Sequence, residues 1–502
     1  MERPKICMTL TGKTLSEDLA LLEKYRNYID MVELRADFLN TDERLLIRRF
    51  PALAGMPSVL TIRRSIDGGQ YVEGEGARTV MFARALSFAD SDTSKNFAYV
   101  DFEEDFHVPS LQDAALAFGT RIIRSVHDMN NPIKDIAVRL DSLRTSGYEI
   151  PKIAFMPHSL QDVTELFREA EQLKDTQHIL IAMGPLGLPS RILGARLKNY
   201  LTFVSATEKN EGIANLGQLD PKILTDVYHF PTVSESTKVF GITGWPLTAT
   251  SSPELHNSGY EKHNINAVYI PLKTPNVKEA VAFAETVGMT GLSVTVSHKE
   301  KVLDCIGELD EKVKAIGSCN TIVRQENGIW KGYNTDGTGF TDALLKFTGT
   351  KDLRGWKVAI IGAGGAAKAI AWAVKSLRAK ACIFNRTVSK AVALAEKYGF
   401  EYEVLPKEPS EKTVRMLKKY SDLIIQTTSV GMNVPPPSTP ENDPLFFYNF
   451  TGKELLFDII YVPAVTPVMQ RASEFGCRVC NGWDMLRFQG YEQFKLFTGE
   501  AY

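Results

Sequence analysis

Residues 150–157 read IPKIAFMP, an apolar run with a single lysine inside it. Such a run is typical of a buried strand in a parallel sheet, where a free charge is not tolerated. An ionised Lys152 would be costly there, so we expect its amine to be paired, to reach a cavity or to lose its proton. A lysine with a lowered pKa is a nucleophile that forms Schiff bases with ketones and aldehydes. The alternative is a strand-end lysine whose amine extends into solvent.

This run is one of eight apolar segments in the first half of the chain, and amphipathic helical patterns separate them. The predicted strands are 5–11, 31–37, 57–64, 98–104, 121–128, 150–157, 178–185 and 201–207. The helical patterns include 16–28, 133–147 and 160–173. Eight parallel strands, each followed by a helix, within about 225 residues predict an α/β fold of the (β/α)8 type, a TIM barrel.

A TIM barrel carries its chemistry at the C-terminal ends of its strands. Polar side chains of the first half gather at these positions: Glu33, Arg35, Arg63, Asp67, Asp101, Glu103, His127, Lys152 and Arg191. The lysine suits Schiff-base formation, and the histidine suits proton transfer near neutral pH. The arginines suit an anionic substrate, such as a carboxylate held by two hydrogen bonds. Any one of these charges alone could be a structural ion pair, but the whole set predicts an active site.

The first half, from residue 1 to about 225, resembles the type I 3-dehydroquinate dehydratases. The matching stretches are VELRAD (32–37), TIRRSIDGG (61–69), SVHD (125–128), IPKIAFMP and the Ser190-Arg191 pair. The resemblance implies that Lys152 is the Schiff-base lysine and His127 the general acid and base. It also implies that a further set of residues binds or surrounds the substrate: Thr9, Glu33, Arg35, Arg63, Asp67, Arg191 and Gln218.

Three positions in this half depart from the family pattern. Thr9 stands where the family commonly has serine, and Asp67 where it often has glutamate. The family pattern Ser-Ala-Pro-Gly-Gln is replaced by residues 214–218, Ala-Asn-Leu-Gly-Gln. Gln218 is therefore kept, whereas Ala214 replaces a serine that would hydrogen-bond the substrate.

The polar stretch FPTVSESTK (230–238) has no periodicity, so we place the end of the barrel domain, 1–230, there. Further along, the predicted strand 356–361 runs into GAGGAA (362–367) and then into a helical pattern. This is the G-x-G-x-x-A signature in the strand–turn–helix context of a dinucleotide-binding Rossmann domain, which we place at 348–465. Glycines let the backbone approach a pyrophosphate at the helix N-terminus. The predicted cofactor contacts here are Gly362, Gly364, Gly365 and Ala366.

The next predicted strand, ACIFN (381–385), indicates which dinucleotide binds. A site for NAD would place an acidic residue at its end, to hydrogen-bond the ribose 2′-hydroxyl. The strand ends instead in Asn385-Arg386-Thr387, with Lys390 one turn later. A guanidinium and an ammonium suit a 2′-phosphate, so the sequence predicts NADP(H) as the cofactor. The alternative is an incidental basic surface.

Residues 238–347 are predicted to form a separate α/β domain with strands at 238–244, 267–272, 291–297 and 319–325, and 466–502 to return to it as helices. The stretch 238–502 resembles shikimate dehydrogenase. The matching pieces are 244–257, 291–300, SCNT (318–321), GYNTDGTG (332–339), GAGGAA, NRT and 481–490. Thr250, Ser293 and Ser297 stand where many relatives have serine, asparagine and proline.

This second resemblance implies a catalytic pair of Lys299 and Asp336. It implies that the substrate carboxylate and hydroxyls contact Thr250, Ser252, Thr295, Asn320 and Gln489, and that the nicotinamide lies near Tyr461 and Gly482. A lysine and an aspartate that are paired can pass a proton to or from a hydroxyl while a hydride moves. The alternative is an ordinary salt bridge, which we would favour if the glycine loop were absent.

The bulk composition excludes several function classes. A net charge of −2 argues against nucleic acid or an anionic membrane as the main partner. No apolar run approaches the length of a bilayer span. Six scattered cysteines, with only Cys477 and Cys480 close together, and eight unclustered histidines predict no metal site. We expect a cytoplasmic protein, because the N-terminus enters a strand at once and leaves no room for a leader. We also expect a monomer with small-molecule substrates.

Together the two resemblances imply consecutive steps of the shikimate pathway: dehydration of 3-dehydroquinate to 3-dehydroshikimate, then NADPH-dependent reduction to shikimate. Two alternatives stay open. The second half could act on quinate as well as shikimate, since the two molecules differ by little more than a water. The chain could also be an inactive metabolite sensor on the same folds. The presence of Lys152, His127, Lys299 and Asp336 argues against a sensor, which needs no nucleophile.

Overall fold

A computed structural model of the chain describes residues 3–86, 90–173, 176–206, 216–247, 250–406, 408 and 410–502. Contacts within the chain define two compact units. The first comprises Met1–Ile242 and Tyr260–Met289, and the second comprises Thr243–Gly259 and Thr290–Tyr502.

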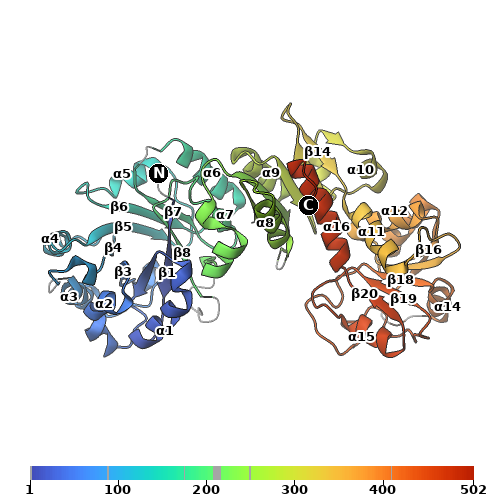
Figure 1. Ribbon diagram of the computed structural model, residues 1–502, viewed down its shortest axis with the longest axis horizontal. Helices are drawn as coiled ribbons and strands as arrows, with labels where there is room; N and C mark the ends of the chain where they lie inside the picture. The colour runs from blue at the N-terminus through green and yellow to red at the C-terminus, as the bar shows by residue number, and fades with distance from the viewer. Residues whose placement is uncertain are drawn as a thin grey trace. The chain divides into compact units, whose positions relative to one another are not determined.

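The first unit is built on eight parallel strands with helices around them (Figure 1). Along the sheet the strands follow the order β7-β6-β5-β4-β3-β2-β1-β8. Their bounds are β1 Lys5–Leu10, β2 Met31–Arg35, β3 Ser58–Thr61, β4 Tyr99–Glu103, β5 Arg121–Asp128, β6 Ile150–Phe155, β7 Ile179–Ala182 and β8 Leu201–Val204. A bridge between His178 and Asn199 brings the two end strands together, so the barrel is nearly closed. The predicted TIM barrel is confirmed.

The helices of the barrel follow its strands in turn. They are α1 Leu15–Tyr25, α2 Phe50–Ala54, α3 Glu75–Leu86, α4 Pro109–Ala117, α5 Ile136–Ser142, α6 Leu160–Glu171 and α7 Leu188–Ile192. The predicted helix 133–147 is shortened at both ends. Asp135 has a positive φ of 55°, so the helix begins after it. Beyond the other end, the Thr145 hydroxyl and the Ser146 amide donate to the Glu149 carboxylate, which turns the chain away from the helix.

Two layers of side chains fill the barrel interior. The lower layer, toward the N-terminal ends of the strands, is apolar and consists of Cys7, Met31, Val59, Tyr99, Ile123, Ile150, Ile179 and Leu201. Side chains two residues further along each strand point to the same face. There the strands carry Thr9, Glu33, Thr61, Asp101, Ser125, Lys152, Ile181 and Phe203. The strand period of two therefore places a mostly polar layer directly above an apolar one.

The part of the chain after the barrel packs against it within the first unit. Here β10, Ala267–Lys273, lies beside α7, and α9, Val277–Thr286, lies beside α6. The rings of Phe167 on α6 and Phe283 on α9 meet edge to face with centroids 5.3 Å apart. β9, Lys238–Gly244, also lies mostly in this unit. The predicted separate domain 238–347 is therefore divided between the two compact units.

Two helix ends are capped across this interface. The Leu160 amide, at the start of α6, donates to the Glu279 carboxylate of α9 over 3.1 Å. The Arg196 guanidinium, just after α7, donates to the Val287 carbonyl at the end of α9 and to the Thr237 carbonyl. A carboxylate at a helix N-terminus and a cation at a helix C-terminus both oppose the helix dipole. Each partner thus stabilises a helix end of the other.

The second unit contains the predicted Rossmann sheet, all of whose strands are parallel in the order β17-β16-β15-β18-β19-β20. The strands are β15 Lys357–Ile361, β16 Lys380–Asn385, β17 Glu401–Val404, β18 Leu423–Gln426, β19 Leu455–Asp458 and β20 Arg478–Cys480. The helices are α12 Gly365–Ser376, α13 Val388–Tyr398, α14 Glu411–Lys419 and α15 Pro467–Glu474. Apolar clusters cover both faces of the sheet, as expected for parallel strands.

The Rossmann sheet extends past its predicted end at residue 465. β20 pairs with β19, and α15 contacts both strands, because the apolar face of α15 completes one face of the sheet. Only α16, Trp483–Thr498, returns to pack along α11, Asp336–Thr348, and to contact β11 and β13. The two helices cross closely. A Cβ at Gly339 would lie 2.5 Å from the backbone nitrogen of Gln489, so the crossing requires glycine.

The remaining elements of the second unit form a smaller sheet with its own helices. Within this unit the strands β11 Gly291–Val294, β13 Thr321–Arg324, β14 Trp330–Tyr333 and β12 Glu308–Leu309 are neighbours in that order. The helices are α10 Glu311–Ile316 and most of α8 Ser252–Lys262. β11 and β13 were predicted, whereas the short strands β12 and β14 were not.

Candidate active sites

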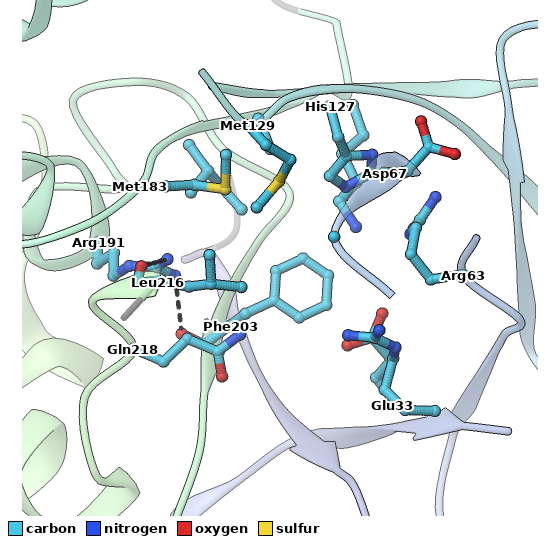
Figure 2. A pocket seen from close by; sticks show the side chains of 15 residues that line it. Glu33, Arg63, Asp67, His127, Met129, Met183, Arg191, Phe203, Leu216 and Gln218 are labelled. Carbon is cyan, nitrogen blue, oxygen red and sulfur yellow. Dashed lines mark hydrogen bonds between the residues drawn. The ribbon is translucent and has the colours of Figure 1, made fainter. Parts of the chain in front are cut away.

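The first candidate site is a pocket at the C-terminal end of the barrel strands, lined by Glu33, Arg35, Arg63, Asp67, Gly68, His127, Met129, Lys152, Ala154, Ile181, Met183, Arg191, Phe203, Leu216 and Gln218. Figure 2 shows His127, Asp67 and Arg63 on one side of Phe203, and Arg191 and Gln218 on the other. All the residues that the resemblance assigns to this site line the pocket except Thr9, whereas Asp101 and Glu103, which the strand-end pattern adds, contact the lining residues Arg63 and Lys152. Ala214 lies outside the described residues.

Lys152 is 4% exposed and sits in the polar layer of the barrel. Its Nζ lies 2.9 Å from an Asp101 carboxylate oxygen and 4.4 Å from the centre of the Phe203 ring. The amine therefore meets two of the expectations at once, because it is paired and also lines the pocket. It does not extend into solvent as a strand-end lysine would.

Asp101 serves several cationic and polar groups. Arg63 and Lys152 both contact its carboxylate, and the Ser125 hydroxyl donates to it. Burial alone would raise the pKa of Asp101, but the two cations outweigh burial and hold the pKa well below its usual range. Arg63 also pairs with Glu103 over 2.7 Å. The carboxylate is thus a fixed negative charge that holds Lys152 in the pocket.

His127 lies at the end of β5 and faces the same pocket. Burial, followed by the nearby Arg63 and Lys152 cations, lowers the pKa of His127 well below its usual value. Its Nδ1 has no hydrogen-bond partner among the described residues. A neutral imidazole with a free nitrogen can accept a proton from a bound molecule.

Arg191 is a buried guanidinium without a carboxylate partner among the described residues. It donates to the Phe203 and Leu216 carbonyls, and its Nε is unpartnered in the part of the chain that the structure describes. Burial lowers the pKa of Arg191 to about 10. The Gln218 side-chain oxygen, on the same side of the pocket, has no described partner either. An anionic ligand at this end would supply the missing charge.

The other predicted residues of the barrel site are held in place by neighbouring side chains. Hydroxyls of Thr9 and Thr61 donate to the two oxygens of Glu33 over 3.0 and 2.8 Å. Thr9 thus fixes Glu33 and does not line the pocket itself. Arg35 forms two hydrogen bonds with Asp37, and Asp67 accepts one from Arg64 over 2.6 Å.

Sequence reasoning left several residues of this site out of the predicted set. Asp101, which was noted at a strand end, turns out to be the direct partner of Lys152. Apolar side chains also line the pocket, among them Met129, Met183 and Phe203. The strand period of two would have placed Phe203 inside the barrel. No signal of that kind exists for Met129, which follows a strand.

The second candidate site lies in the second unit and centres on Lys299 and Asp336. The Lys299 amine forms an ion pair with Asp336 Oδ2, and both side chains are largely buried. The Lys299 side chain also approaches the glycine loop, since a Cβ at Gly365 would lie 3.7 Å from its Cδ. The predicted pair is thus formed beside the loop that was predicted to bind the cofactor.

Asn320 and Gln489 join the same cluster. The Asn320 amide nitrogen donates to Asp336 Oδ1 over 2.9 Å, to the Thr335 hydroxyl over 2.9 Å and to the Gln489 side-chain oxygen over 3.4 Å. The Thr335 backbone amide donates back to Asn320 Oδ1 over 2.8 Å. Thr335 was not predicted, although it directly precedes Asp336 in the sequence.

The remaining predicted residues lie near the start of α8, beside Trp483 and at the end of β11. Thr250 and Ser252 hydrogen-bond each other at the start of α8, and Tyr461 contacts Thr250, its pKa being raised by burial. The Tyr461 ring packs against Trp483. Gly482 precedes Trp483, and a Cβ there would collide with the Ile459 carbonyl. Thr295 lies at the end of β11, where its amide donates to the Thr243 carbonyl.

The glycine loop between β15 and α12 has the features that a pyrophosphate needs. Gly362 has φ of +115°, and a Cβ there would lie 2.5 Å from the Thr427 hydroxyl. A Cβ at Gly364 would meet nothing within 4 Å, so the backbone of the loop is open on that side. Gly364 is the N-cap of α12, and no side chain caps its amides. Ala366 follows in the first turn. The residues present thus fit an anionic group at this helix end.

The end of β16 presents exposed polar and basic groups. The Asn385 amide donates to the Thr387 carbonyl, which shapes the turn into α13. Arg386 and Lys390 are exposed, and no ion pair of either is found among the described residues. Both cations are therefore free to contact a phosphate.

Two other kinds of site are absent from the described residues. They contain no group of three or more histidine, cysteine or acidic side chains arranged to hold a metal ion. No helix among them is long and apolar enough to cross a membrane. Burial raises the pKa of the Cys477 and Cys480 thiols to about 11 in each case, and neither forms a disulfide.

Three family models match successive parts of the chain. Type I 3-dehydroquinase matches residues 6–235. The shikimate dehydrogenase substrate binding domain matches residues 242–322, and shikimate / quinate 5-dehydrogenase matches residues 344–436. The order of the matches is that of the barrel, the smaller sheet and the Rossmann sheet.

Individual relatives repeat this pattern. The bifunctional 3-dehydroquinate dehydratase/shikimate dehydrogenase of Arabidopsis thaliana is 31% identical over 94% of this chain and 78% of its own. The NADP(+) shikimate dehydrogenase of Pyrococcus abyssi is 38% identical over 52% of this chain and 92% of its own. That of Caldanaerobacter subterraneus is 37% identical over 54% and 95%. The chain belongs to the family of bifunctional 3-dehydroquinate dehydratases/shikimate dehydrogenases.

Proposed function

We propose that the chain carries out two consecutive steps of the shikimate pathway of aromatic amino acid biosynthesis. The barrel, residues 1–230, dehydrates 3-dehydroquinate to 3-dehydroshikimate, and residues 238–502 reduce that product to shikimate with NADPH. The observation that supports this proposal most directly is the pocket that brings Lys152, His127 and the unpaired Arg191 together. It joins a nucleophile, a base and an anion site in one cavity.

In the barrel, Lys152 is the residue that reacts covalently. As a free amine it condenses with the substrate ketone, and water leaves as the imine forms. The ammonium must first lose a proton, and the neutral His127 beside it is the available acceptor. The imidazolium returns this proton to the carbinolamine hydroxyl, which leaves as the water of condensation, so that the imine is protonated and His127 is neutral again. Asp101, which stays ionised, holds the amine in the barrel axis. The apolar layer below offers no partner to the amine, so the amine stays in the polar layer.

His127 then acts on the carbon next to the imine. The protonated imine withdraws electrons, so that this carbon loses a proton to the imidazole. The imidazolium returns a proton to the departing hydroxyl, which leaves as water, and hydrolysis of the imine releases Lys152. We assign the carboxylate of the substrate to Arg191, because its Nε has no hydrogen-bond partner and its charge no carboxylate partner among the described residues. The Gln218 side-chain oxygen beside it can accept from a substrate hydroxyl. Glu33, Arg35, Arg63 and Asp67 complete the set of binding residues, with Thr9 supporting Glu33.

In the second unit, Lys299 and Asp336 handle the proton of the reduction. NADPH, when bound, supplies the hydride. Lys299 holds the proton that the carbonyl oxygen takes up, and Asp336 orients the ammonium. Thr250, Ser252, Thr295, Asn320 and Gln489 supply the hydroxyls and amides that suit a hydroxylated carboxylate.

The cofactor assignment rests on residues of the Rossmann sheet. The open, uncapped start of α12 with Gly362, Gly364, Gly365 and Ala366 would hold the pyrophosphate. Arg386 and Lys390, with Asn385 and Thr387 shaping the turn, would hold the 2′-phosphate. Tyr461 and Gly482 would lie by the nicotinamide. The names of the Pyrococcus and Caldanaerobacter relatives also specify NADP(+).

A coupled assay tests the proposal as a whole. The purified chain, 3-dehydroquinate and NADPH should consume NADPH and accumulate shikimate without any added enzyme. NADPH consumption with 3-dehydroshikimate alone would confirm only the second step. No turnover of either compound would support an inactive sensor instead.

A second substrate calls for a direct comparison, because the model that matches residues 344–436 is named for both shikimate and quinate. The two compounds carry a carboxylate and several hydroxyls and would meet the same polar pocket. Oxidation of each by NADP⁺ should be compared at equal concentration. We expect shikimate to be the better substrate.

Other properties of the chain are proposed on general grounds. The chain works as a monomer in the cytoplasm on small-molecule substrates, without nucleic acid or membrane partners. The net charge of −2 supports the last point, because partners of high negative charge attract basic surfaces. Light scattering of the purified chain tests the monomer, and fractionation of cells tests the location.

A further inference from the structure

Gln493 is a buried residue of α16 that lies one helical turn beyond Gln489, and its side chain is 3% exposed. Both ends of its carboxamide are engaged. The Ser293 hydroxyl donates to its Oε1 over 3.0 Å. Its Nε2 donates to the Thr321 hydroxyl over 2.8 Å and to the Asn320 backbone carbonyl over 3.2 Å. Gln493 therefore ties α16 to both β11 and β13.

The amide group of Gln493 decides which way the Thr321 hydroxyl points. A hydroxyl can donate or accept, so its own geometry leaves its direction open. Because Gln493 Nε2 donates to the Thr321 oxygen, the hydroxyl proton is left to donate to Asn320 Oδ1, 3.0 Å away. The Thr335 amide donates to the same oxygen.

This direction in turn fixes the side chain of Asn320. With its side-chain oxygen held by Thr321 and Thr335, Asn320 presents its amino group to Asp336 Oδ1 at 2.9 Å. The other oxygen of Asp336 contacts Lys299. A flipped Asn320 would place its side-chain oxygen against the carboxylate, which is repulsive. A continuous chain of donors therefore runs from Gln493 through Thr321 and Asn320 to Asp336.

We propose that Gln493 is a positioning residue of the reduction step, which sets the orientation of Asn320 and thereby of the Asp336–Lys299 pair. The inference rests on the proposed function, since it assumes that this pair handles the proton. Gln493 itself does not touch the reacting atoms. Were it only a packing residue of α16, its shape would matter and its donor group would not.

Gln493→Glu in the full chain separates these two roles, because glutamate keeps the shape and loses the donor. The Thr321 hydroxyl would then donate to the new carboxylate and release Asn320. We expect kcat for reduction of 3-dehydroshikimate to fall about ten- to a hundredfold, the scale of one misplaced charge-assisted hydrogen bond. The KM for NADPH should stay within about twofold of wild type, because the cofactor loop takes no part in the hydrogen bonds that link Gln493 to Asp336.

The pH dependence of kcat in Gln493→Glu gives a second test, because a packing role of Gln493 predicts no change of the deficit with pH. The titratable group that faces this position is His256, which contacts Gln493, and burial lowers the pKa of His256 to about 3, so that its imidazole is neutral in wild type. When the carboxylate that Gln493→Glu introduces is protonated, it regains an O–H donor. The deficit in kcat relative to wild type should therefore shrink from about pH 8 to about pH 5.5. Thr321→Val is the second variant; it removes the hydroxyl at constant shape and introduces no charge. Its kcat should fall to a similar extent without recovery at low pH.

Controls come from the same chain. Dehydration of 3-dehydroquinate by each preparation should equal wild type and reports that the barrel is folded, while an unchanged KM for NADPH reports that the second unit is folded. Gln172→Glu makes the same chemical change at an exposed site on the barrel and should leave both activities unchanged. Wild-type kcat in Gln493→Glu, or an equal deficit at both pH values together with an unaffected Thr321→Val, would overturn the inference. A wild-type chain that fails to reduce 3-dehydroshikimate would overturn the proposed function as well.

Discussion

In the barrel, one buried carboxylate, Asp101, is shared between Lys152 and Arg63, whereas in the second unit Lys299 has Asp336 as its own partner. The barrel site adds a further cation, Arg191, that no described carboxylate neutralises. Around Lys299 and Asp336 the neighbours are neutral amides and hydroxyls.

The difference corresponds to the two kinds of chemistry. Burial, together with the nearby Arg63 and Lys152 cations, keeps His127 neutral, and so able to accept protons, beside a lysine that must lose one. It also suits a substrate that arrives as an anion. A balanced ion pair among neutral donors suits a step in which a proton is passed on and no covalent bond to the protein forms. A single chain thus holds two lysines with the same side chain but different neighbours and different roles.

The sharpest way to break this comparison is to remove the covalent lysine. Lys152→Ala should lower dehydration by on the order of ten-thousandfold or more, the scale seen when a nucleophile is lost. Reduction of supplied 3-dehydroshikimate should be unchanged. Borohydride with substrate should attach the ligand to Lys152 in wild type, as peptide mass spectrometry would show. Lys134→Ala, at an exposed site, is the matched control. Labelling at another lysine would contradict the assignment.

Removal of the other lysine should give the opposite pattern. Lys299→Ala should lower reduction by about a hundred- to ten-thousandfold, because proton transfer in the transition state contributes on this scale. Dehydration should stay within a small factor of wild type. Initial rates of the two steps, measured separately on one preparation, test both statements. A parallel loss of both activities in a folded variant would mean that the sites are not independent.

The cofactor preference should change by a smaller amount. Arg386→Ala removes one of two cations assigned to the 2′-phosphate, a contact worth roughly 1.5–3 kcal/mol. The ratio of kcat/KM for NADPH to that for NADH should therefore fall about ten- to a hundredfold. Dehydration is the internal control. An unchanged ratio would place the 2′-phosphate elsewhere.

The pH dependence of dehydration tests the lowered pKa of His127. Because the pKa of His127 is lowered below its usual value of about 6.5, the imidazole is neutral above that pH and remains so somewhat below it. The kcat/KM for 3-dehydroquinate should be flat from about pH 8 down to about pH 6.5 and fall only at lower pH. A midpoint at or above about pH 7 would show that burial and the nearby cations do not lower the pKa of this histidine.

The smallest effect is expected at the contact between the barrel and α9. Glu279→Ala removes the carboxylate that accepts from the Leu160 amide, while the capping box of Ser159 and Asp162 at the start of α6 remains, and it should cost about 0.5–1.5 kcal/mol, a fall of a few degrees in Tm. Both activities should persist at low temperature. Glu326→Ala, at an exposed position in the second unit, is the control. An unchanged Tm in Glu279→Ala, measured by calorimetry, would show that this contact does not stabilise the fold.

The strand pattern made most of the fold predictable. Apolar runs at regular spacing located the barrel strands and the strand before the glycine loop, because local periodicity follows directly from burial. The short strands β12 and β14 carry too few residues to show a period. The packing of α9 on α6 was also not predictable, since an apolar helix face does not indicate which surface will cover it.

The residues of the candidate sites were likewise predictable only in part. The residue types and their places at strand ends identified Lys152, His127 and Arg191, all of which line one pocket. The partners of these residues could not be read from spacing, because they come from distant parts of the chain. Asp101 lies 51 positions from Lys152, and Gln493 lies 200 positions from Ser293. Such pairs exist only once the sheet and helices are assembled.

The reciprocal capping of α6 by Glu279 and of α9 by Arg196 has a consequence for how the chain is held together. These hydrogen bonds and the Phe167–Phe283 contact join segments on either side of residues 230–238 without using the peptide bonds between them. Cleavage of the chain by a protease within that stretch would therefore yield two polypeptides that remain bound to each other and copurify. The covalent connection guarantees equal amounts of the two catalysts, whereas the noncovalent contacts of α9 with α6 and Arg196 hold the two segments together.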